Sequence, residues 1–475
     1  MQTFSLTVLG CRVNHYEAEQ IAEVLRTRGL TQVASPGGDV RVVHTCSVTS
    51  QAAKGSRSSV RRATRLTVLN QNEATDFSTP GARVIVTGCW ATSDKAAALQ
   101  MPGVDAVITH HDDVNAELHQ LLDQWQNESC ATTVANTGAR HGTTSLPLLS
   151  LKQSAHQRAF LKIQDGCDAH CTYCIIPQLR PKPWSKPVDD AVREAQALVT
   201  AGHKELVLTG IFLGAYGQPT ALRRRQPHST AKPLSELIDA LCTHVPGLVR
   251  LRLSSLEPGD LTPELIACLR SHAQVVPHFH LPLQSGSDAM LRKMNRQYTR
   301  ADYLNMVDQV HSAFDRPAIT TDIICGFPGE TEADFAQTVD VVDRVGFTHV
   351  HAFTYSARPK TAAARWSADA IDHTLATQRV HILNALAKAN AQTFARQFIG
   401  QNVTVLVEHD APETLTRHGR SERYFDVTFT APDCKPGDLL TVQIDDVGDE
   451  GIHGTVVKSP DVMQTHADSR SSHSS

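Results

Sequence analysis

The sequence predicts an α/β protein with an N-terminal open parallel α/β domain, a central partial (β/α)6 barrel and a small C-terminal antiparallel β-barrel. Three observations lead to this fold class. Short apolar runs that end in glycine alternate with helical patterns near the N-terminus. Six more strand-and-helix units follow in the middle of the chain. The last part carries strand patterns with no helix between them.

The bulk composition is that of a globular protein. The chain has 475 residues, of which 41% are hydrophobic and 20% are charged. No apolar run reaches the length of about 18 residues that predicts a membrane span, and "MQTFSLTVLG" lacks the basic start of a signal peptide. Eleven cysteines, an odd number, favour metal ligands or reactive thiols over a disulfide framework. We therefore expect a cytoplasmic protein.

The N-terminal domain, residues 1–125, carries the runs "FSLTVLG", "DVRVVHTC" and "ARVIVTG", which predict buried parallel strands. A cysteine follows each strand at once: Cys11, Cys46 and Cys89. In open α/β sheets, sites form beyond the carboxyl ends of the strands, so these three thiols can converge. A buried core thiol is the commoner role for any one of them, and their shared position favours a metal cluster.

A polar linker is expected at 126–157, followed by the barrel domain at 158–392. Eight βα units would close a barrel, and six predict an open one. The predicted strands are "AFLKIQDGC", "KELVLTG", "LVRLRLSSLEP", "HFHLPLQSG", "AITTDIICGFPGE" and "THVHAFTYSAR".

The stretch "GCDAHCTYCIIP" places Cys167, Cys171 and Cys174 directly after the first barrel strand. A zinc site needs a fourth ligand, and His170 is too close in sequence to the cysteines for an ordinary zinc knuckle. Three thiolates can instead hold three irons of a [4Fe-4S] cluster and leave one iron open. Such an iron can chelate a substrate or cofactor through oxygen and nitrogen. Three buried thiols without a metal are the simpler alternative.

The C-terminal domain, residues 398–460, contains four predicted strands: "NVTVLVEHD", "RYFDVTFT", "DLLTVQIDDVG" and "GIHGTVV". The tail at 461–475 is polar and expected to be disordered. Small barrels of this kind often bind single-stranded nucleic acid. Residues 395–475 nevertheless carry 7 Lys and Arg against 13 Asp and Glu. We therefore expect any RNA binding there to be confined to the arginines at 417–423.

The cysteine triplet and the motifs after it resemble the radical S-adenosylmethionine superfamily. The resemblance implies that the triplet binds a [4Fe-4S] cluster and that S-adenosylmethionine occupies its fourth iron. It also implies cofactor contacts from three places after barrel strands, where glycines can equally serve strand-to-helix turns. These contacts are Tyr173 beside the adenine, Thr209 and Gly210 near the methionyl part, and Gly326 and Glu330 on the other side.

The N-terminal motifs "LGCRVNHYEAE", "HTCSVTSQAAKGSRSSVRRA" and "VTGCWA" resemble methylthiotransferases. That likeness covers roughly 1–458, includes a TRAM-like C-terminal barrel, and implies a second [4Fe-4S] cluster on Cys11, Cys46 and Cys89. The nearest branch acts at C2 of N6-threonylcarbamoyladenosine, position 37 of tRNA. Two departures are His44, where the family usually has Asn, and "LRPKPWSKP", where it has more arginines.

The resemblance further implies two partners, a tRNA anticodon stem-loop and an electron donor such as flavodoxin or ferredoxin, with no membrane and no DNA. No catalytic acid or base can be named. Two alternatives stay open: a methylthiotransferase that acts on a ribosomal protein side chain, and a non-catalytic iron–sulfur protein that binds RNA or transfers electrons. The expected RNA contacts are Lys54, Arg57, Arg61, Arg62, Arg292, Lys293, Arg296, Arg417, Arg420, Arg423 and Tyr424.

Overall fold

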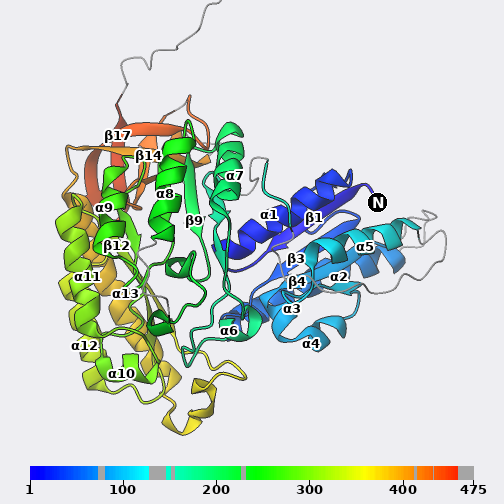
Figure 1. Cartoon of the computed structure of the whole chain (residues 1–475), viewed down its shortest axis with the longest axis horizontal. Helices are drawn as coiled ribbons and strands as arrows, with labels where there is room; N and C mark the ends of the chain where they lie inside the picture. The colour runs from blue at the N-terminus through cyan, green and yellow to red at the C-terminus, as the bar shows by residue number, and fades with distance from the viewer. Residues whose placement is uncertain are drawn as a thin grey trace, which may run out of the picture. The chain divides into compact units, whose positions relative to one another are not determined.

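The computed structural model describes residues 1–72, 81–127, 146–150, 156–225, 232–410, 415–431 and 433–457 (Figure 1). The chain divides into two units, Met1–Ala391 and Gln392–Ser475. Most of the expected linker and the whole expected tail lie outside the described residues. Within the described part, no helix has both the length and the apolar character needed to cross a membrane.

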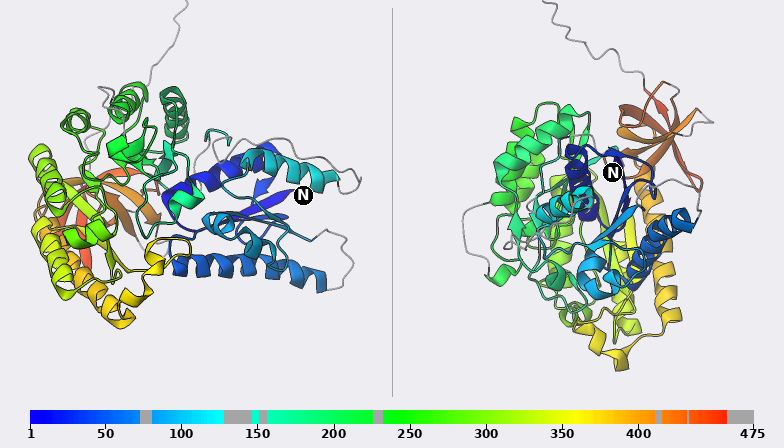
Figure 2. Two further views of the ribbon diagram at one scale, coloured as in Figure 1. Left: turned by 60° about the horizontal axis from the view of Figure 1, so that its bottom comes forward. Right: turned by 90° about the vertical axis from the view of Figure 1, so that its right-hand side faces the viewer.

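The first unit begins with a five-stranded parallel sheet in the order β2-β1-β3-β4-β5. Helices cover both of its faces, α1 and α5 on one and α2 to α4 on the other (Figure 2). The central strand β3 is therefore buried along its whole length. The bounds are β1 Thr3–Val8, α1 Arg12–Thr27, β2 Thr31–Gln32, β3 Val40–Thr45, α2 Ser50–Asn72, β4 Arg83–Gly88, α3 Cys89–Ser93, α4 Lys95–Leu99, β5 Ala106–Val107 and α5 Val114–Asn127.

Six further parallel strands form the predicted partial barrel. They pair as β6-β9-β10 and β11-β12-β13, and single bridges from Leu251 to Val275 and from Ser255 to His280 join β10 to the second group. No pairing between β13 and β6 occurs among the described residues, so the barrel stays open on that side. The strands are β6 Ala159–Lys162, β9 Glu205–Thr209, β10 Arg250–Leu253, β11 His278–His280, β12 Ala318–Cys325 and β13 His349–Thr354.

Helices follow the barrel strands, and Figure 1 shows α8, α9, α11 and α12 beside them. Apolar side chains of these helices share one buried core with those of the strands. A short antiparallel pair, β7 with β8, brackets the cysteine-rich stretch. Their bounds are β7 Gln164–Asp165, α6 Ile176–Leu179, β8 Trp184–Ser185, α7 Val188–Thr200, η2 Leu213–Ala215, η3 Arg223–Arg225, α8 Pro233–His244, α9 Pro263–Ser271, α10 Asp288–Lys293, α11 Arg300–Ala313, α12 Glu332–Val345, η4 Ala363–Arg365, η5 Ser367–Asp369 and α13 His373–Arg396.

The second unit contains a closed five-stranded barrel in the order β14-β15-β16-β18-β17. All its pairs are antiparallel except β16 with β18. Its strand "TRHGRS" was not among the predicted ones, because it lacks the apolar alternation that marks a strand. The fold class predicted from the sequence is otherwise confirmed. The strands are β14 Asn402–Asp410, β15 Thr416–Ser421, β16 Asp426–Thr430, β17 Leu439–Gly448 and β18 Gly451–Val456.

Candidate active site

Cys11, Cys46 and Cys89, the N-terminal cysteine set, lie at the carboxyl ends of the adjacent strands β1, β3 and β4. The Sγ atoms of Cys11 and Cys89 each stand 3.9 Å from Oδ1 of Asn14. Gly10 completes the cluster, since a Cβ there would stand only 2.9 Å from Sγ of Cys46. The structure therefore brings the three thiols to one edge of the sheet.

Asn14 holds this edge together from the first turn of α1. Its buried amide nitrogen donates to the carbonyls of Leu9, at 2.7 Å, and Thr45, at 3.1 Å, which turns its oxygen toward the thiols. Burial raises the pKa of both Cys46 and Cys89, and the other thiols of the set add to the increase. A bound metal supplies the positive charge that stabilises thiolates in such surroundings, so the donor set fits a metal cluster.

Cys167, Cys171 and Cys174 lie in the cysteine loop, residues 166–175, between β7 and α6. Gly166 starts the loop with φ of +76°, and a Cβ there would stand 2.0 Å from the carbonyl oxygen of Lys182. The backbone of Cys167 donates to the carbonyl of Arg180 at 2.9 Å. A glycine is therefore required immediately before the first cysteine.

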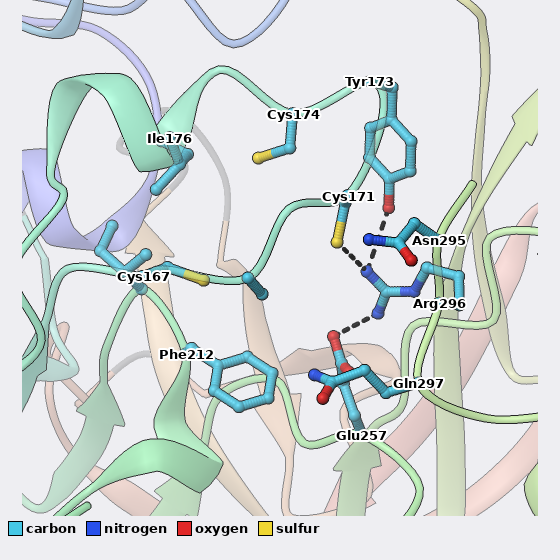
Figure 3. Close-up of a pocket in the computed structure, with 12 residues that line it drawn as sticks. Cys167, Cys171, Tyr173, Cys174, Ile176, Phe212, Glu257, Asn295, Arg296 and Gln297 are labelled. Carbon is cyan, nitrogen blue, oxygen red and sulfur yellow. Dashed lines mark hydrogen bonds and ion pairs between the residues drawn. The ribbon is translucent and has the colours of Figure 1, made fainter. Parts of the chain in front are cut away.

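The three thiols border a cavity of about 110 Å³ (Figure 3). Burial raises the pKa of Cys167 and of Cys174 to about 12. Among the described residues, no three Cys, His, Asp or Glu side chains surround one point as ligands of a single ion do. A [4Fe-4S] cluster is larger than an ion, and thiols around a cavity fit it. The lining residues are Cys167, Ala169, Cys171, Tyr173, Cys174, Ile176, Ile211, Phe212, Glu257, Asn295, Arg296 and Gln297.

Arg296 is the charged centre of this cavity. Figure 3 shows its guanidinium between Cys171, Tyr173 and Glu257. It donates to Sγ of Cys171 at 3.0 Å and to Oη of Tyr173 at 3.3 Å, and it pairs with the carboxylate of Glu257. Only 6% of its side chain is exposed. The sequence suggested Arg296 as an RNA contact, but its side chain is committed to the cysteine loop.

Of the predicted cofactor residues Tyr173, Thr209 and Gly210, only Tyr173 lines the cavity. Tyr173 lines it and packs edge-on against Phe327. Thr209 is buried and does not line the cavity, and a Cβ on Gly210 would stand 3.0 Å from Cβ of Gln164. The Gln164 amide oxygen accepts from the backbone of Phe212 at 2.8 Å and so positions the aromatic wall.

Gly326 and Glu330 do not line the cavity. The Glu330 carboxylate accepts a hydrogen bond from the backbone of Gly326 at 2.7 Å and pairs with Arg379 at 2.6 Å. Gly326 has φ of +72°, and a Cβ there would stand 2.5 Å from Cβ of Ala376. These contacts fix the turn after β12.

A second cavity, of about 200 Å³, borders both the cysteine loop and the segment directly after Cys46, and it was not predicted from the sequence. Val48 and Thr49, just after Cys46, form one wall, and the cysteine loop forms another. Gln284 has φ of +65°, unusual for a residue with a side chain and often found at functional sites. The full lining is Val48, Thr49, Tyr173, Cys174, Ile175, Ile176, Gln284, Asp322, Ile324, Phe353, Tyr355 and Ser356.

A buried ion network joins the sheet to the barrel, and nothing in the sequence revealed it. Glu17 of α1 pairs with Lys162 at 2.9 Å and with Arg180 at 2.7 Å. Asp165 pairs with the same two cations at 3.0 and 2.8 Å. Burial alone would raise the pKa of Glu17, but Arg180 and Lys162 hold it well below its usual range. The network also reaches Cys89, since the charge of Arg180 acts on that thiol.

The predicted RNA contacts lie in three segments of the chain with different surroundings. Lys54, Arg57, Arg61 and Arg62 share α2, and none forms an ion pair with another described residue. Their spacing of three to four residues places most of them along one side of the helix.

The arginines of the second unit are compensated by acids. Arg420 pairs with Glu408 at 3.4 Å and Asp426 at 2.8 Å, and it lies over the ring of Tyr424. Arg423 pairs with Glu422 at 2.6 Å. The acids paired with Arg420 and Arg423 reduce the positive potential around 417–423.

On α10, Lys293 pairs with Asp369 at 2.9 Å.

Two family profiles match the chain: the radical SAM superfamily over residues 161–342, and uncharacterized protein family UPF0004 over residues 3–109. Among curated relatives, "Threonylcarbamoyladenosine tRNA methylthiotransferase MtaB" of Bacillus subtilis (strain 168) is 35% identical over 94% of each chain. The protein of the same name from Thermotoga maritima is 30% identical over 95% of this chain and 96% of its own. A "tRNA-2-methylthio-N(6)-dimethylallyladenosine synthase" of Frankia casuarinae is 35% identical over 86% of this chain and 71% of its own.

Solved structures share the fold at low sequence identity. The radical S-adenosylmethionine methyltransferase TsrM from Kitasatospora setae, with cobalamin and a [4Fe-4S] cluster bound, has a TM-score of 0.53 at 13% identity, over 76% of this chain and 77% of its own. The cobalamin-dependent S-adenosylmethionine radical enzyme OxsB, with aqua-cobalamin and S-adenosylmethionine bound, has a TM-score of 0.50 at 11% identity, over 83% of this chain and 58% of its own. With relatives at 30–35% identity over nearly the full length, the chain belongs to the methylthiotransferase family of radical S-adenosylmethionine enzymes.

Proposed function

We propose that this protein transfers a methylthio group to C2 of N6-threonylcarbamoyladenosine at position 37 of tRNA, next to the anticodon. The observation that carries the proposal is a single cavity lined both by the cysteine loop and by the segment directly after Cys46. Cys174 lines this cavity directly, and Val48 and Thr49 line it from the segment after Cys46. The names of two near full-length relatives support the modified base.

Cys167, Cys171 and Cys174 would hold the first [4Fe-4S] cluster, with S-adenosylmethionine at its open iron. When bound, these groups would supply the radical chemistry that removal of the unactivated hydrogen from C2 requires. Tyr173 and Phe212 provide aromatic walls beside the thiols. The hydrogen bond from Arg296 to Cys171 stabilises negative charge on that sulfur, and such bonds tune the potential of a cluster.

Cys11, Cys46 and Cys89 would hold a second [4Fe-4S] cluster that carries the sulfur to be transferred. Three protein ligands again leave one iron open. Asn14 orients two of the thiols. The substrate base must leave its stack to enter the cavity, as bases of single-stranded RNA loops do when proteins recognise them. The basic side of α2 would contact the phosphates of the anticodon stem-loop, and flavodoxin or ferredoxin in the cytoplasm would supply the electrons.

The proposal is tested on RNA from a strain that lacks this protein. Nucleosides of total tRNA are separated and identified by mass spectrometry. We expect the methylthio form of N6-threonylcarbamoyladenosine to disappear and to return with the wild-type gene but not with Cys46→Ala or Cys171→Ala. Persistence of the modified nucleoside in the deletion strain contradicts the proposal. Loss of methylthio-dimethylallyladenosine instead would assign the substrate named for the Frankia casuarinae relative.

Iron and sulfide analysis of the anaerobically purified protein tests the two clusters. We expect about eight irons per chain, as two four-iron clusters require. About four irons would contradict the assignment of Cys11, Cys46 and Cys89. Failure to form 5′-deoxyadenosine from S-adenosylmethionine and dithionite would favour a non-catalytic iron–sulfur protein. If the deletion strain keeps its normal tRNA nucleosides but loses the methylthio group from a ribosomal protein, the alternative protein substrate is favoured.

A further inference from the structure

The segment after β13, residues 355–363, connects the two cysteine regions, and we call it the strap. At one end, Oγ of Ser356 accepts a hydrogen bond from the backbone of Ser50 at 2.9 Å and lies 2.7 Å from its hydroxyl. At the other end, the carbonyl of Lys360 accepts from Gln178 at 2.7 Å. The backbone of Ala363 donates to the carbonyl of Thr172 at 2.8 Å. The strap therefore runs from the loop after Cys46 to the cysteine loop.

Arg358 lies in the middle of the strap, and its charge has no counterion among the side chains that the structure describes. The residue is only 9% exposed, and its Nε atom is buried without a hydrogen-bond partner. Its guanidinium forms no hydrogen bond or ion pair with any residue in the described part of the chain. Burying an arginine without a partner is costly, so an anion is expected beside it.

Two neighbours indicate where that anion lies. The charge of Arg358 acts on the thiol of Cys46, one of the N-terminal cysteine set. The pKa of Arg358 is lowered, first by burial and also by the positive charge of Arg57. The two cations repel each other, which increases the need for negative charge at the Cys46 edge.

We propose that Arg358 binds a small sulfur anion, hydrosulfide or methanethiolate, at the N-terminal cysteine set. This inference rests on the proposed second cluster. A cluster held by three thiolates is negatively charged, and a sulfur anion on its open iron adds another charge in a buried site. The guanidinium offers five N–H donors to balance that charge. An RNA phosphate fits less well, because a phosphate remains solvated and Arg358 is nine-tenths buried.

The test uses the full chain with both clusters reconstituted anaerobically and with S-adenosylmethionine added to occupy the open iron of the first cluster. Sodium sulfide or sodium methanethiolate is titrated, and the electron paramagnetic resonance spectrum of the reduced second cluster reports binding. We expect Arg358→Gln to weaken binding by at least about tenfold, the effect of losing a charged hydrogen bond. Arg358→Lys retains the charge, so its affinity for the sulfur anion should lie between those of the wild type and Arg358→Gln. The control is Arg365→Gln, at an exposed position of η4, and it should bind the anion like the wild type.

The outcomes separate this inference from the proposed function. A wild-type protein with only four irons rejects the second cluster itself. If eight irons are present and Arg358→Gln binds sulfide like the wild type, the inference is overturned. It is also overturned if Arg358→Lys is no better than Arg358→Gln, or if both variants lose the second cluster. A loss of tRNA affinity in Arg358→Gln with unchanged sulfide binding would identify a phosphate contact instead.

Discussion

Gly166 shows how strongly one residue controls the cysteine loop. An added Cβ would stand 2.0 Å from the carbonyl oxygen of Lys182, well inside contact distance, and φ is +76°. We predict that Gly166→Ala displaces Cys167 and lowers the iron content from about eight to about four per chain. Iron and sulfide analysis after anaerobic reconstitution measures the change.

The matched control is Gly202→Ala. Gly202 also has a positive φ, of +104°, but a Cβ there meets nothing within 4 Å. Both variants carry similar backbone strain, of about 1–3 kcal/mol, and only Gly166→Ala carries the steric clash. Full iron content in Gly166→Ala would mean that the loop accommodates the extra carbon and that Cys167 does not depend on this turn.

Helix α1 connects the sheet to the barrel through charge as well as apolar contact. Its Glu17 carboxylate is fully buried between Lys162 and Arg180. We predict that Glu17→Gln lowers the free energy of unfolding at pH 7 by about 3–5 kcal/mol, because both cations lose a counterion. Urea unfolding of the cluster-free protein measures this. Glu264→Gln, at an exposed position of α9, should leave the stability almost unchanged.

The ion pairs of Glu17 with Lys162 and Arg180 also predict how the free energy of unfolding depends on pH. The pKa of Glu17 in the folded protein lies below its ordinary value of 4.5. Its contribution to stability is therefore complete above about pH 4.5 and is lost as the pH falls through the folded value. The difference between wild type and Glu17→Gln should shrink on acidification below that point. A difference that stays constant down to about pH 3 would show that packing, and not charge, makes Glu17 important.

Elements with a strong apolar pattern could be predicted from the sequence, and elements set by distant partners could not. The sequence predicts six strand-and-helix units in the barrel domain, and the structure forms all six strands. Strand β15 contains two arginines and no alternation, and it forms because β14 and β16 pair with it on both sides. Helix α1 buries Glu17 and Glu23, which its sequence alone would place in solvent.

The candidate site divides in the same way. The strand-end positions of Cys11, Cys46 and Cys89 were readable because parallel strands end at a shared edge. The function of Arg296 was not, because "KMNRQYT" resembles a solvated basic segment until the fold places it against Cys171. Arg358 was missed for the same reason. A charge looks alike in sequence whether it is buried or exposed, and only tertiary contacts distinguish the two.

At the scale of the whole molecule, RNA must bind a chain with a net charge of −4. We predict that Lys54→Ala, Arg61→Ala and Arg62→Ala together weaken tRNA binding and reduce the salt slope by about 2, as the loss of three phosphate contacts implies. Removing Arg417, Arg420 and Arg423 together should have a smaller effect, because acids already compensate two of them. Filter binding at two salt concentrations measures both variants.

A control with the same change of net charge is Arg193→Ala, Lys204→Ala and Arg344→Ala, all on exposed positions of the barrel domain. Its affinity should stay close to that of the wild type. Equal losses in the control and in the α2 variant would mean that only net charge matters. An unchanged affinity after the loss of Arg417, Arg420 and Arg423 would remove the second unit from RNA recognition.

The buried network of Glu17, Lys162, Asp165 and Arg180 has a consequence for recombination between relatives. The network contains two acids and two cations. Glu17 lies 145 residues before Lys162 and 163 before Arg180, so it belongs to a different part of the chain from its partners. A chimera that takes its first 125 residues from one homologue and its barrel from another inherits the network only if both parents carry it. Otherwise an unmatched charge is sealed at the junction, and the hybrid is destabilised before any chemistry is tried. The network therefore restricts which N-terminal domains can be combined with which barrels in a stable chimera.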